Sequence, residues 1–400
     1  MSGGRAHAPA SARRITLAAT GLVLSSTLPQ YMIGAVAVSI RQDFAFSNAE
    51  LGFAVGASFG VAAVTTAAAG RLIERIGPRA GIRVAIALLL ASVVAIATVV
   101  NSAAPLIVCM AGVGLAAGIG SPSFAGLLAV GVRHGRQGTA FGLLTSAPQL
   151  AAFTAGLALP LIADPFGWRV AFVIPVATAA VSMLVMPSLR NLSAGREVAP
   201  SQAVPTPQVI SMRRLQPIHV MALAGTLASA GGIGMRSFLV VFAVAVGFSS
   251  SDAGLLLAAA GAIALVSRIG IGVLGDRRPG DALLRAGGLM LVSATGFVLM
   301  AVGAHFTIII GALLAGGLGW GWVAPMNLAV IQRHRHAPAA AMGTQMTGFF
   351  SGALIGPLLV GILIGTGGFT VAWVLCTVFA VLAAAAALAA RRMSPEPRPA

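Results

Sequence analysis

Two arginines lie inside long apolar stretches of this 400-residue chain: Arg236 in the run 217–247 and Arg268 in the run 252–274. At about 1.5 Å per helical residue, they would lie roughly 16 and 24 Å from one end of their helices. A charge deep in an apolar phase costs about 2.5–3.5 kcal/mol or more, so it normally faces a cavity or a partner. No Asp or Glu lies in the interior of any apolar run. A guanidinium offers two parallel donors that fit a carboxylate, so the simplest missing partner is a small organic anion.

Each arginine also has a structural interpretation. Arg268 stands eight residues before Asp276, on roughly the same helical face, so an ion pair near the end of the helix would explain it. Arg236 would be explained if its long stem extended toward the membrane surface. The sequence leaves these alternatives open.

Polar and aromatic residues within the apolar runs complete a candidate binding cavity. Mid-helix amides orient a ligand and aromatic rings form its walls, although aromatic residues in such runs are often simple packing groups. We also expect Pro29 to interrupt the first helix next to Gln30 and Tyr31, the only tyrosine. The predicted substrate-binding set is Gln30, Tyr31, Gln149, Arg236, Arg268, Trp320, Trp322, Asn327 and Gln345, with Phe349 and Phe350 nearby.

The composition excludes a soluble protein. The chain is 58% hydrophobic and only 8% charged, with a mean hydropathy of +0.96, whereas a soluble domain carries about 25% charged residues. The net charge of +16 comes from 25 arginines without any lysine, and these arginines cluster at the ends of apolar runs. Their position indicates membrane topology and not nucleic-acid binding. The two cysteines lie in apolar runs and read as packing residues, so we expect no metal, disulfide or cofactor.

Twelve apolar runs are long enough to cross a bilayer, which needs about 20 residues. Twenty-one of the 25 arginines fall on one side of this arrangement, and only Arg41 and Arg169 fall in loops on the other. The positive-inside rule therefore predicts a multi-pass protein of the cytoplasmic (inner) membrane with both termini cytoplasmic. The runs are 15–40, 48–70, 82–101, 105–130, 139–163, 168–188, 217–247, 252–274, 282–303, 306–330, 340–365 and 370–390.

The chain divides into two halves. The longest connection, 189–216, is rich in Pro, Ser and Arg and predicts a cytoplasmic linker between a bundle at 1–188 and a second bundle with a short tail at 217–400. A shift of 202 residues places the Gly-x-Leu-x-Glu-Arg pattern at 70–75 over Gly-x-Leu-x-Asp-Arg at 272–277, and a shift of 201 places Gly167 over Gly368. Two parallel six-helix repeats suit a transporter with a central site.

Two motifs resemble the major facilitator superfamily. They are the loop Gly70-Arg71-Leu72-Ile73-Glu74-Arg75-Ile76-Gly77-Pro78-Arg79, where Glu74 replaces the usual Asp, and Gly167-Trp168-Arg169-Val170-Ala171-Phe172. The resemblance covers the whole chain and implies an all-α integral membrane fold of twelve transmembrane helices in two pseudo-symmetric six-helix bundles. It also implies a cytoplasmic gate at Glu74, Arg75 and Arg79, with Asp276 and Arg277 as the partial counterpart. The alternative is that these charges only set topology.

The eighth run resembles a narrower group. Ser267-Arg268-Ile269-Gly270 and the following Gly272, Gly275, Asp276 and Arg277 are similar to the eighth span of monocarboxylate and oxalate/formate transporters, which implies substrate binding by Arg268. Two features depart from those branches: span eleven has Gln345 and Thr347 but no Lys, and Ala264 stands where the proton-coupled carriers have Asp.

We therefore expect a secondary active or facilitative transporter that moves a small carboxylate-type anion by alternating access. Its partners would be this solute and the lipid bilayer, and a monomer is the family default. The alternative is an exporter of hydrophobic or cationic compounds. The absence of an interior acid disfavours it, as does span five, which reads Thr145-Ser146-Ala147-Pro148-Gln149 without a Gly-Pro-Gly-Gly-type motif. We expect no enzyme, because Ser, His and an acid are never placed together outside the runs.

Overall fold

The computed structural model describes residues 9–132, 134–186, 216–277, 280–334 and 337–394, and all regular elements within these ranges are helical. The predicted linker 189–216 lies outside the described residues except for Gln216, so the domain boundaries remain predictions. Ten helices of the described chain are long and apolar enough to cross a membrane, and a bent pair makes an eleventh span. One of the ten, the 56-residue α15, is two helices joined at a kink, which brings the spans to the predicted twelve.

The first half of the chain forms one group of helices. It comprises α1 (Pro9–Ala35), α2 (Ala37–Asp43), α3 (Asn48–Ile76), α4 (Pro78–Thr98), α5 (Ala103–Gly131), α6 (His134–Ala158), the π-helix η1 (Leu159–Ala163), α7 (Asp164–Phe166), α8 (Trp168–Ala171) and α9 (Val173–Val185).

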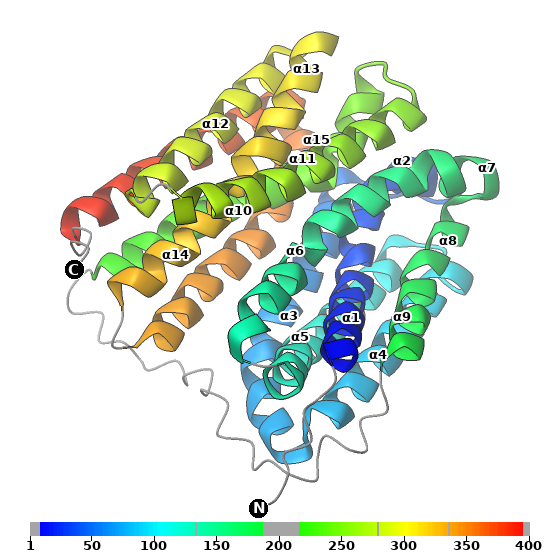
Figure 1. Cartoon of the computed structure of the whole chain (residues 1–400). Coiled ribbons are helices and arrows are strands. Elements are labelled where there is room, and N and C mark those ends of the chain that lie inside the picture. Colours follow the sequence, from blue (N-terminus) through cyan, green and yellow to red (C-terminus); the bar gives the residue numbers. More distant parts are fainter. Residues whose placement is uncertain (1–8, 133, 187–215, 278–279, 335–336, 395–400) are drawn as a thin grey trace, which may run out of the picture.

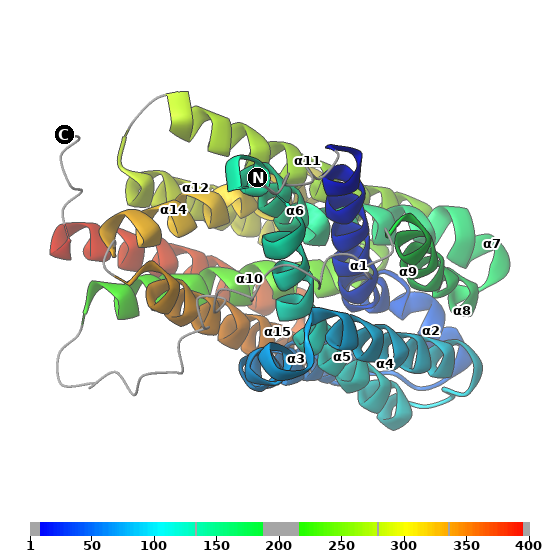
Figure 2. The same cartoon turned by 60° about the horizontal axis from the view of Figure 1, so that its bottom comes forward.

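The second half forms another group. It comprises α10 (Pro217–Ala245), α11 (Ser250–Arg277), α12 (Ala282–Val302), α13 (His305–Ala312), the π-helix η3 (Leu313–Leu318), the 3-10 helix η4 (Gly319–Trp322), α14 (Val323–Arg333) and α15 (Pro338–Met393). Figure 1 and Figure 2 show the two groups side by side, with α6 of the first half packed along α11 of the second.

The first span bends at a different place from the one expected. The sequence predicts an interruption at Pro29, but α1 continues through Pro29 to Ala35. The bend of 65° lies between α1 and α2, at Val36. Neighbouring helices support a helix that has lost one backbone hydrogen bond, so a proline inside a packed membrane span need not end it.

Two equivalent glycine turns reflect the internal repeat. Gly167 separates spans five and six with a φ of 93°, and Gly368 separates spans eleven and twelve within α15 with a φ of 79°. Side chains disfavour this left-handed region, so glycine is required at both turns. The shift of 201 residues that aligns them in the sequence therefore relates two turns of the same geometry, as expected of pseudo-symmetric bundles.

The two halves meet closely at one end of the molecule, which we call the closed end and which carries Asp43, Asp164, Arg169 and Ser250. There, Gly156 of α6 faces the backbone of α11 at Ala258, and Gly52 of α3 faces the backbone of α15 at Pro357. A Cβ at either glycine would overlap the facing backbone atoms. Small residues of this kind let membrane helices approach and slide past one another.

A polar contact also joins the halves at the closed end. The Asp164 carboxylate of α7 accepts hydrogen bonds from the hydroxyls of Ser250 (2.8 Å) and Ser251 (3.1 Å) in the first turn of α11. The positive end of the α11 helix dipole lies at this turn, which favours a neighbouring carboxylate.

The same helices separate toward the other end, which we call the open end and which carries Arg75, Arg79, Arg333 and Arg391. No described atom lies within 4 Å of a Cβ built on Gly142 of α6, Gly70 of α3, Gly270 of α11 or Gly343 of α15. In Figure 1 the two groups of helices converge near α2 and α7 and diverge toward the end of α14. The two halves are therefore in close contact at one end of the molecule and separated at the other.

Gly156→Leu should destabilise the closed end, because the leucine side chain would overlap backbone atoms of α11. Overpacking of this kind costs about 1–3 kcal/mol, which should lower the thermal unfolding midpoint of the purified protein. Gly142→Leu is the matched control on the same helix, at a site with open space, and should leave the midpoint unchanged. Equal midpoints for the two variants would contradict the assigned packing.

Asp164→Ala should loosen the closed end, because it removes both hydrogen bonds to α11. We would label Phe166→Cys and Phe306→Cys, two exposed positions in opposite halves, with spin labels after replacing Cys109 and Cys376 by Ala. We expect a longer-distance population in Asp164→Ala that the parent lacks. Asp252→Ala is the control, since the described hydrogen bonds of Asp252 go to the nearby Ser249 of its own helix end. If Asp164→Ala gave the same distance distribution as the parent, the contact of Asp164 with α11 would not hold the closed end together.

Candidate substrate-binding cavity

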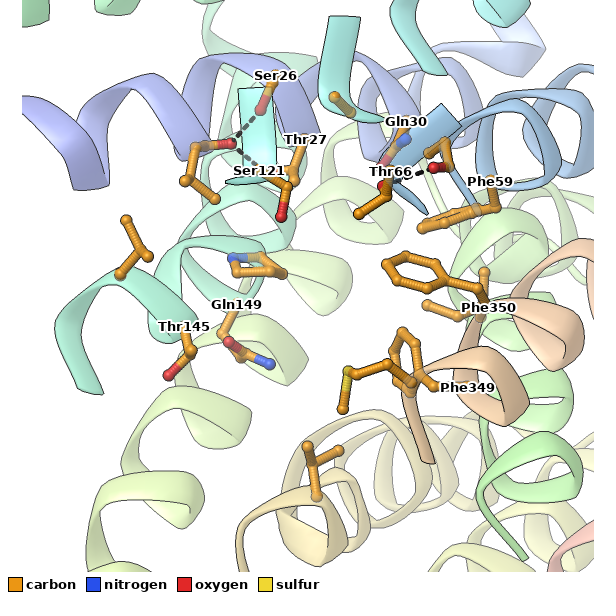
Figure 3. Close-up of a pocket in the computed structure, with 18 of the residues that line it drawn as sticks. Ser26, Thr27, Gln30, Phe59, Thr66, Ser121, Thr145, Gln149, Phe349 and Phe350 are labelled. Atoms are coloured by element: carbon orange, nitrogen blue, oxygen red, sulfur yellow. Dashed lines mark hydrogen bonds between the residues drawn. The ribbon is translucent and has the colours of Figure 1, made fainter. Parts of the chain in front are cut away.

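A cavity of about 280 Å³ lies between the two halves. The first half contributes residues of α1, α3, α5 and α6, and the second half contributes residues of α10, α11, η4, α14 and α15 (Figure 3). Among the described residues that line it there is no Asp or Glu. The polar lining residues are Ser26, Thr27, Gln30, Tyr31, Thr66, Ser121, Thr145, Gln149, Arg268, Trp320 and Asn327.

Arg268 contributes a partly buried guanidinium to the cavity wall from α11. Its described polar contact is the side-chain amide of Gln149, which reaches across from α6. With the amide oriented to match the donors around it, the Gln149 oxygen accepts from Arg268 at 3.3 Å and from the Trp320 indole N–H at 3.2 Å. A neutral amide of the first half therefore meets the cation of the second half inside the cavity.

The local helix geometry explains why Gln149 points inward. Thr145, Pro148 and Gln149 are spaced at i, i+3 and i+4, so they share one face of α6, and all three line the cavity. Gln149 is nearly fully buried, and in the same orientation its amide nitrogen donates to the Ser146 carbonyl at 3.1 Å. This second bond holds the amide oxygen toward Arg268 and Trp320.

Arg236 lies behind the cavity wall and does not line it. Its side chain is only 2% exposed, which rules out the alternative that its stem extends to the membrane surface. The guanidinium donates to the Gly316 carbonyl at 2.5 Å and lies 4.3 Å from the centre of the Trp320 ring. One guanidinium nitrogen has no hydrogen-bond partner among the described residues.

Arg236 contacts the irregular part of the tenth span. Gly316 belongs to the π-helix η3, and the following 3-10 helix η4 carries Trp320. Single π-helical turns are often found at functional sites because they change the direction of the following side chains. Gly232, one turn before Arg236 on α10, leaves the space that the Trp320 ring occupies. The Arg236 guanidinium therefore lies over the ring of Trp320, a residue that lines the cavity and whose indole N–H donates to Gln149.

Two neighbouring residues of α1, Gln30 and Tyr31, lie on the side of the first half that faces the arginines. Tyr31 is largely buried and lines the cavity, close enough to Arg236 and Arg268 to interact electrostatically with both. Gln30 donates to the Ser58 hydroxyl at 2.6 Å and so ties α1 to α3. The only tyrosine of the chain therefore faces two cations that come from α10 and α11.

The structure places six of the nine predicted substrate-binding residues on the cavity wall: Gln30, Tyr31, Gln149, Arg268, Trp320 and Asn327. The other three, Arg236, Trp322 and Gln345, are buried outside it. Trp322 packs against Phe349, and the Gln345 amide lies beside Gly225 of α10. Asn327 keeps a carbonyl oxygen without a hydrogen-bond partner among the described residues.

Several hydroxyl residues and two phenylalanines of the cavity wall were not predicted. They are Ser26, Thr27, Thr66, Ser121, Phe59 and Phe124. Hydroxyl groups in membrane helices commonly bond a carbonyl one turn earlier, as Thr66 does to Ala62 at 2.6 Å, so their residue type carries little signal. The usable signal was spacing, because Ser26 and Thr27 precede Gln30 and Tyr31 by one turn of the same face.

The predicted gate is described only in part. The side chains of Glu74, Asp276 and Arg277 lie outside the described structure, whereas Arg75 is exposed and Arg79 is partly buried at the open end. The gate therefore remains a prediction.

An ion-pair cluster that was not predicted, with one aspartate and two arginines, is present at the open end. Asp281 accepts from the backbone N–H groups of the first turn of α12 and pairs with Arg333 (3.1 Å) and Arg391 (2.6 Å). Burial raises the pKa of Asp281, but the hydrogen bond from Arg391, the charge of Arg333 and the backbone donors together hold this pKa below its ordinary value. The cluster joins α12, α14 and α15 of the second half.

The described residues contain no group of three or more His, Cys, Asp or Glu that could hold a metal ion. Cys109 and Cys376 are free thiols in the described structure. The lining residues of the cavity offer a ligand hydrogen bonds, the positive charge of Arg268 and apolar contact.

Comparison with known proteins agrees with this architecture. The family model described as Major Facilitator Superfamily matches residues 19–341. Two crystal structures of a bacterial homolog to the human lysosomal transporter Spinster, one inward-facing and occupied and one inward-facing and unoccupied, each superpose with a TM-score of 0.72 at 16% sequence identity. They cover 98% and 99% of this chain and 100% of their own. At this identity the likeness shows the fold alone, and no curated protein matches the chain.

The matched segment covers most of the chain and contains both motifs that carry the resemblance. The twelve spans, the repeated glycine turns and the cavity between two halves agree with it. The chain belongs to the Major Facilitator Superfamily and is a multi-pass membrane transporter that works by alternating access, not an enzyme.

Proposed function

We propose that the protein moves an organic anion of the carboxylate type across the cytoplasmic membrane. The observation that carries the proposal is the guanidinium of Arg268 in the wall of a cavity whose described lining residues include no acid. Arg236 adds a second cation behind the wall, where it interacts with the same tyrosine. A carboxylate is the ligand that this combination of charge and donors fits best.

Binding would exchange a neutral acceptor for a charged one. In the structure, the Gln149 oxygen accepts hydrogen bonds from Arg268 and from the Trp320 N–H. A carboxylate accepts stronger, charge-assisted hydrogen bonds than an amide does, so it would displace the Gln149 oxygen from Arg268. Because Gln149 and Arg268 belong to different halves, this exchange would change a contact on which the relative position of the halves depends.

The direction of opening follows from the arginine distribution. The positive-inside rule assigns the open end, with Arg75, Arg79, Arg333 and Arg391, to the cytoplasm together with both termini. The cavity would then be open to the cytoplasm and closed to the outside. A gate made by Glu74, Arg75 and Arg79, with Asp276 and Arg277, belongs at this end, and we expect the transporter to act as a monomer.

A second candidate function is the export of hydrophobic or cationic compounds. The four phenylalanines of the cavity favour it because they offer apolar contact area; they are Phe59, Phe124, Phe349 and Phe350. The two arginines argue against a cationic substrate, since they would repel it at close range. Ligand binding therefore separates the two functions.

Arg268→Gln should abolish carboxylate binding, because it removes the only charged group on the described cavity wall. We would screen mono- and dicarboxylates, amino acids, sugars and lipophilic cations for thermal stabilisation of the purified protein. A ligand at 100 times its Kd stabilises by about 2.7 kcal/mol. Arg392→Gln, an exposed arginine at the end of α15, is the matched charge control and should respond as the wild type does. Stabilisation by lipophilic cations alone, equal in wild type and Arg268→Gln, would replace the anion proposal with the exporter.

Arg236→Gln should weaken carboxylate binding by about ten-fold, equivalent to about 1.4 kcal/mol, and not abolish it. The reason is that Arg236 acts through its charge and through the position of Trp320, without lining the cavity. Isothermal titration of wild type, Arg236→Gln and Arg268→Gln with one carboxylate would rank the three. Complete loss of binding in Arg236→Gln, with a normal unliganded unfolding midpoint, would mean that Arg236 contacts the substrate directly.

A further inference from the structure

Three aromatic rings lie on one side of the cavity, as Figure 3 shows. Phe59 comes from α3 of the first half, whereas Phe349 and Phe350 come from α15 of the second. Gln30 and Thr66 lie beside Phe59, and Ser26, Thr27, Ser121, Thr145 and Gln149 lie across the cavity from Phe349 and Phe350. A fourth phenylalanine, Phe124 of α5, also lines the cavity.

Trp320, Phe349 and Phe350 form a continuous aromatic surface with available area. Phe349 packs edge-on against Phe350, with ring centroids 5.7 Å apart, and edge-on against Trp320 at 6.2 Å. Phe349 and Phe350 are partly exposed, and both line the cavity. Aromatic pairs favour such edge-to-face geometry, so the surface offers a further ring a place to continue it.

Trp320 connects the aromatic surface to the anion-binding group. Its indole N–H meets the Gln149 oxygen that also accepts from Arg268, and its ring contacts Phe349. One side chain therefore spans from the cation to the phenylalanines. A ligand whose anionic group replaces the Gln149 oxygen would have its body directed along Trp320, with Phe349 and Phe350 beside it.

The size of the cavity supports the same reading. A volume of about 280 Å³ approaches the lower end of pockets that bind ligands the size of drugs, roughly 300–1,000 Å³. A two-carbon carboxylate would occupy Arg268 and leave the apolar side of the cavity without contacts. An apolar body attached to the carboxylate would fill that side and remove both surfaces from water.

We infer that the substrate is an amphipathic carboxylate, with one anionic group on a flat apolar body such as an aromatic ring. This inference rests on the proposed anion transport and makes it specific. The carboxylate binds Arg268 and the Trp320 N–H, and the ring packs against Phe349, Phe350 and Phe59. Small hydrophilic carboxylates and dicarboxylates should bind less tightly, because they lack the apolar body that would contact the phenylalanines.

The test is a series of matched ligands titrated into the purified full-length protein. Acetate, cyclohexanecarboxylate, benzoate and 2-naphthoate vary the apolar body at constant charge, succinate adds a second charge, and benzamide and benzamidine remove or reverse the charge of benzoate. We expect benzoate and 2-naphthoate to bind at least ten-fold more tightly than acetate or succinate. Benzamide and benzamidine should bind more weakly than benzoate.

Variants of the aromatic side provide the second arm. Phe350→Ala and Phe59→Ala should each weaken benzoate by about 2- to 10-fold, the size of one aromatic pair interaction, and leave acetate unchanged. Phe350→Leu keeps an apolar side chain of similar size and should lose only part of the benzoate affinity. Phe306→Ala, which alters an exposed ring at the closed end, is the control. Unliganded unfolding midpoints verify that each variant is folded.

The outcomes separate the inference from the function beneath it. If acetate or succinate binds as tightly as benzoate, or if Phe350→Ala and Phe350→Leu weaken acetate as much as benzoate, the amphipathic substrate is overturned while anion transport stands. If no carboxylate binds, or benzamidine binds more tightly than benzoate, the proposed anion transport itself fails.

Discussion

The arrangement around the cavity depends on the positive charge of two arginines inside an apolar bundle. Their described contacts are neutral groups: the Gly316 carbonyl and the Trp320 ring for Arg236, and the Gln149 amide for Arg268. Tyr31 lies close to both arginines. A buried carboxylate would neutralise such a charge permanently. Neutral dipoles stabilise it only in part. The proposed transport of an anion rests on this incomplete compensation.

The same charges lie where the two halves touch. Tyr31 and Gln149 reach the arginines from α1 and α6, while the arginines belong to α10 and α11. Close glycine contacts and the Asp164 carboxylate hold the opposite end together, and the open end lacks such contacts at the equivalent glycines. Alternating access requires that the contacts at one end break when those at the other form. A ligand that replaces an inter-half hydrogen bond at the centre can bias this exchange, because it changes the free energy of one state relative to the other.

Local pattern accounted for much of the site. Arg268, Gln149 and Asn327 were identified because a charged or amide side chain is conspicuous in an apolar run, and Tyr31 because it is the only tyrosine. The structure places all four on the cavity wall. Arg236 was conspicuous for the same reason, but burial behind Trp320 depends on the π-helix at Gly316 and on the space at Gly232. Asp281 was missed because its partners are 52 and 110 residues away. Phe59 and the hydroxyl residues were missed because their types are common in every span.

The membrane class, the twelve spans, the repeat and the interior arginines without an interior acid all follow from the amino-acid sequence. These properties depend on composition and on periodicity along the chain, since about 20 apolar residues cross a bilayer whatever their neighbours are. The packing of the helices sets which arginine faces the cavity, which phenylalanines line it, and which end is closed. Those properties depend on the rotation of each helix about its axis and on contacts between distant segments, which helix packing sets and which no single span encodes.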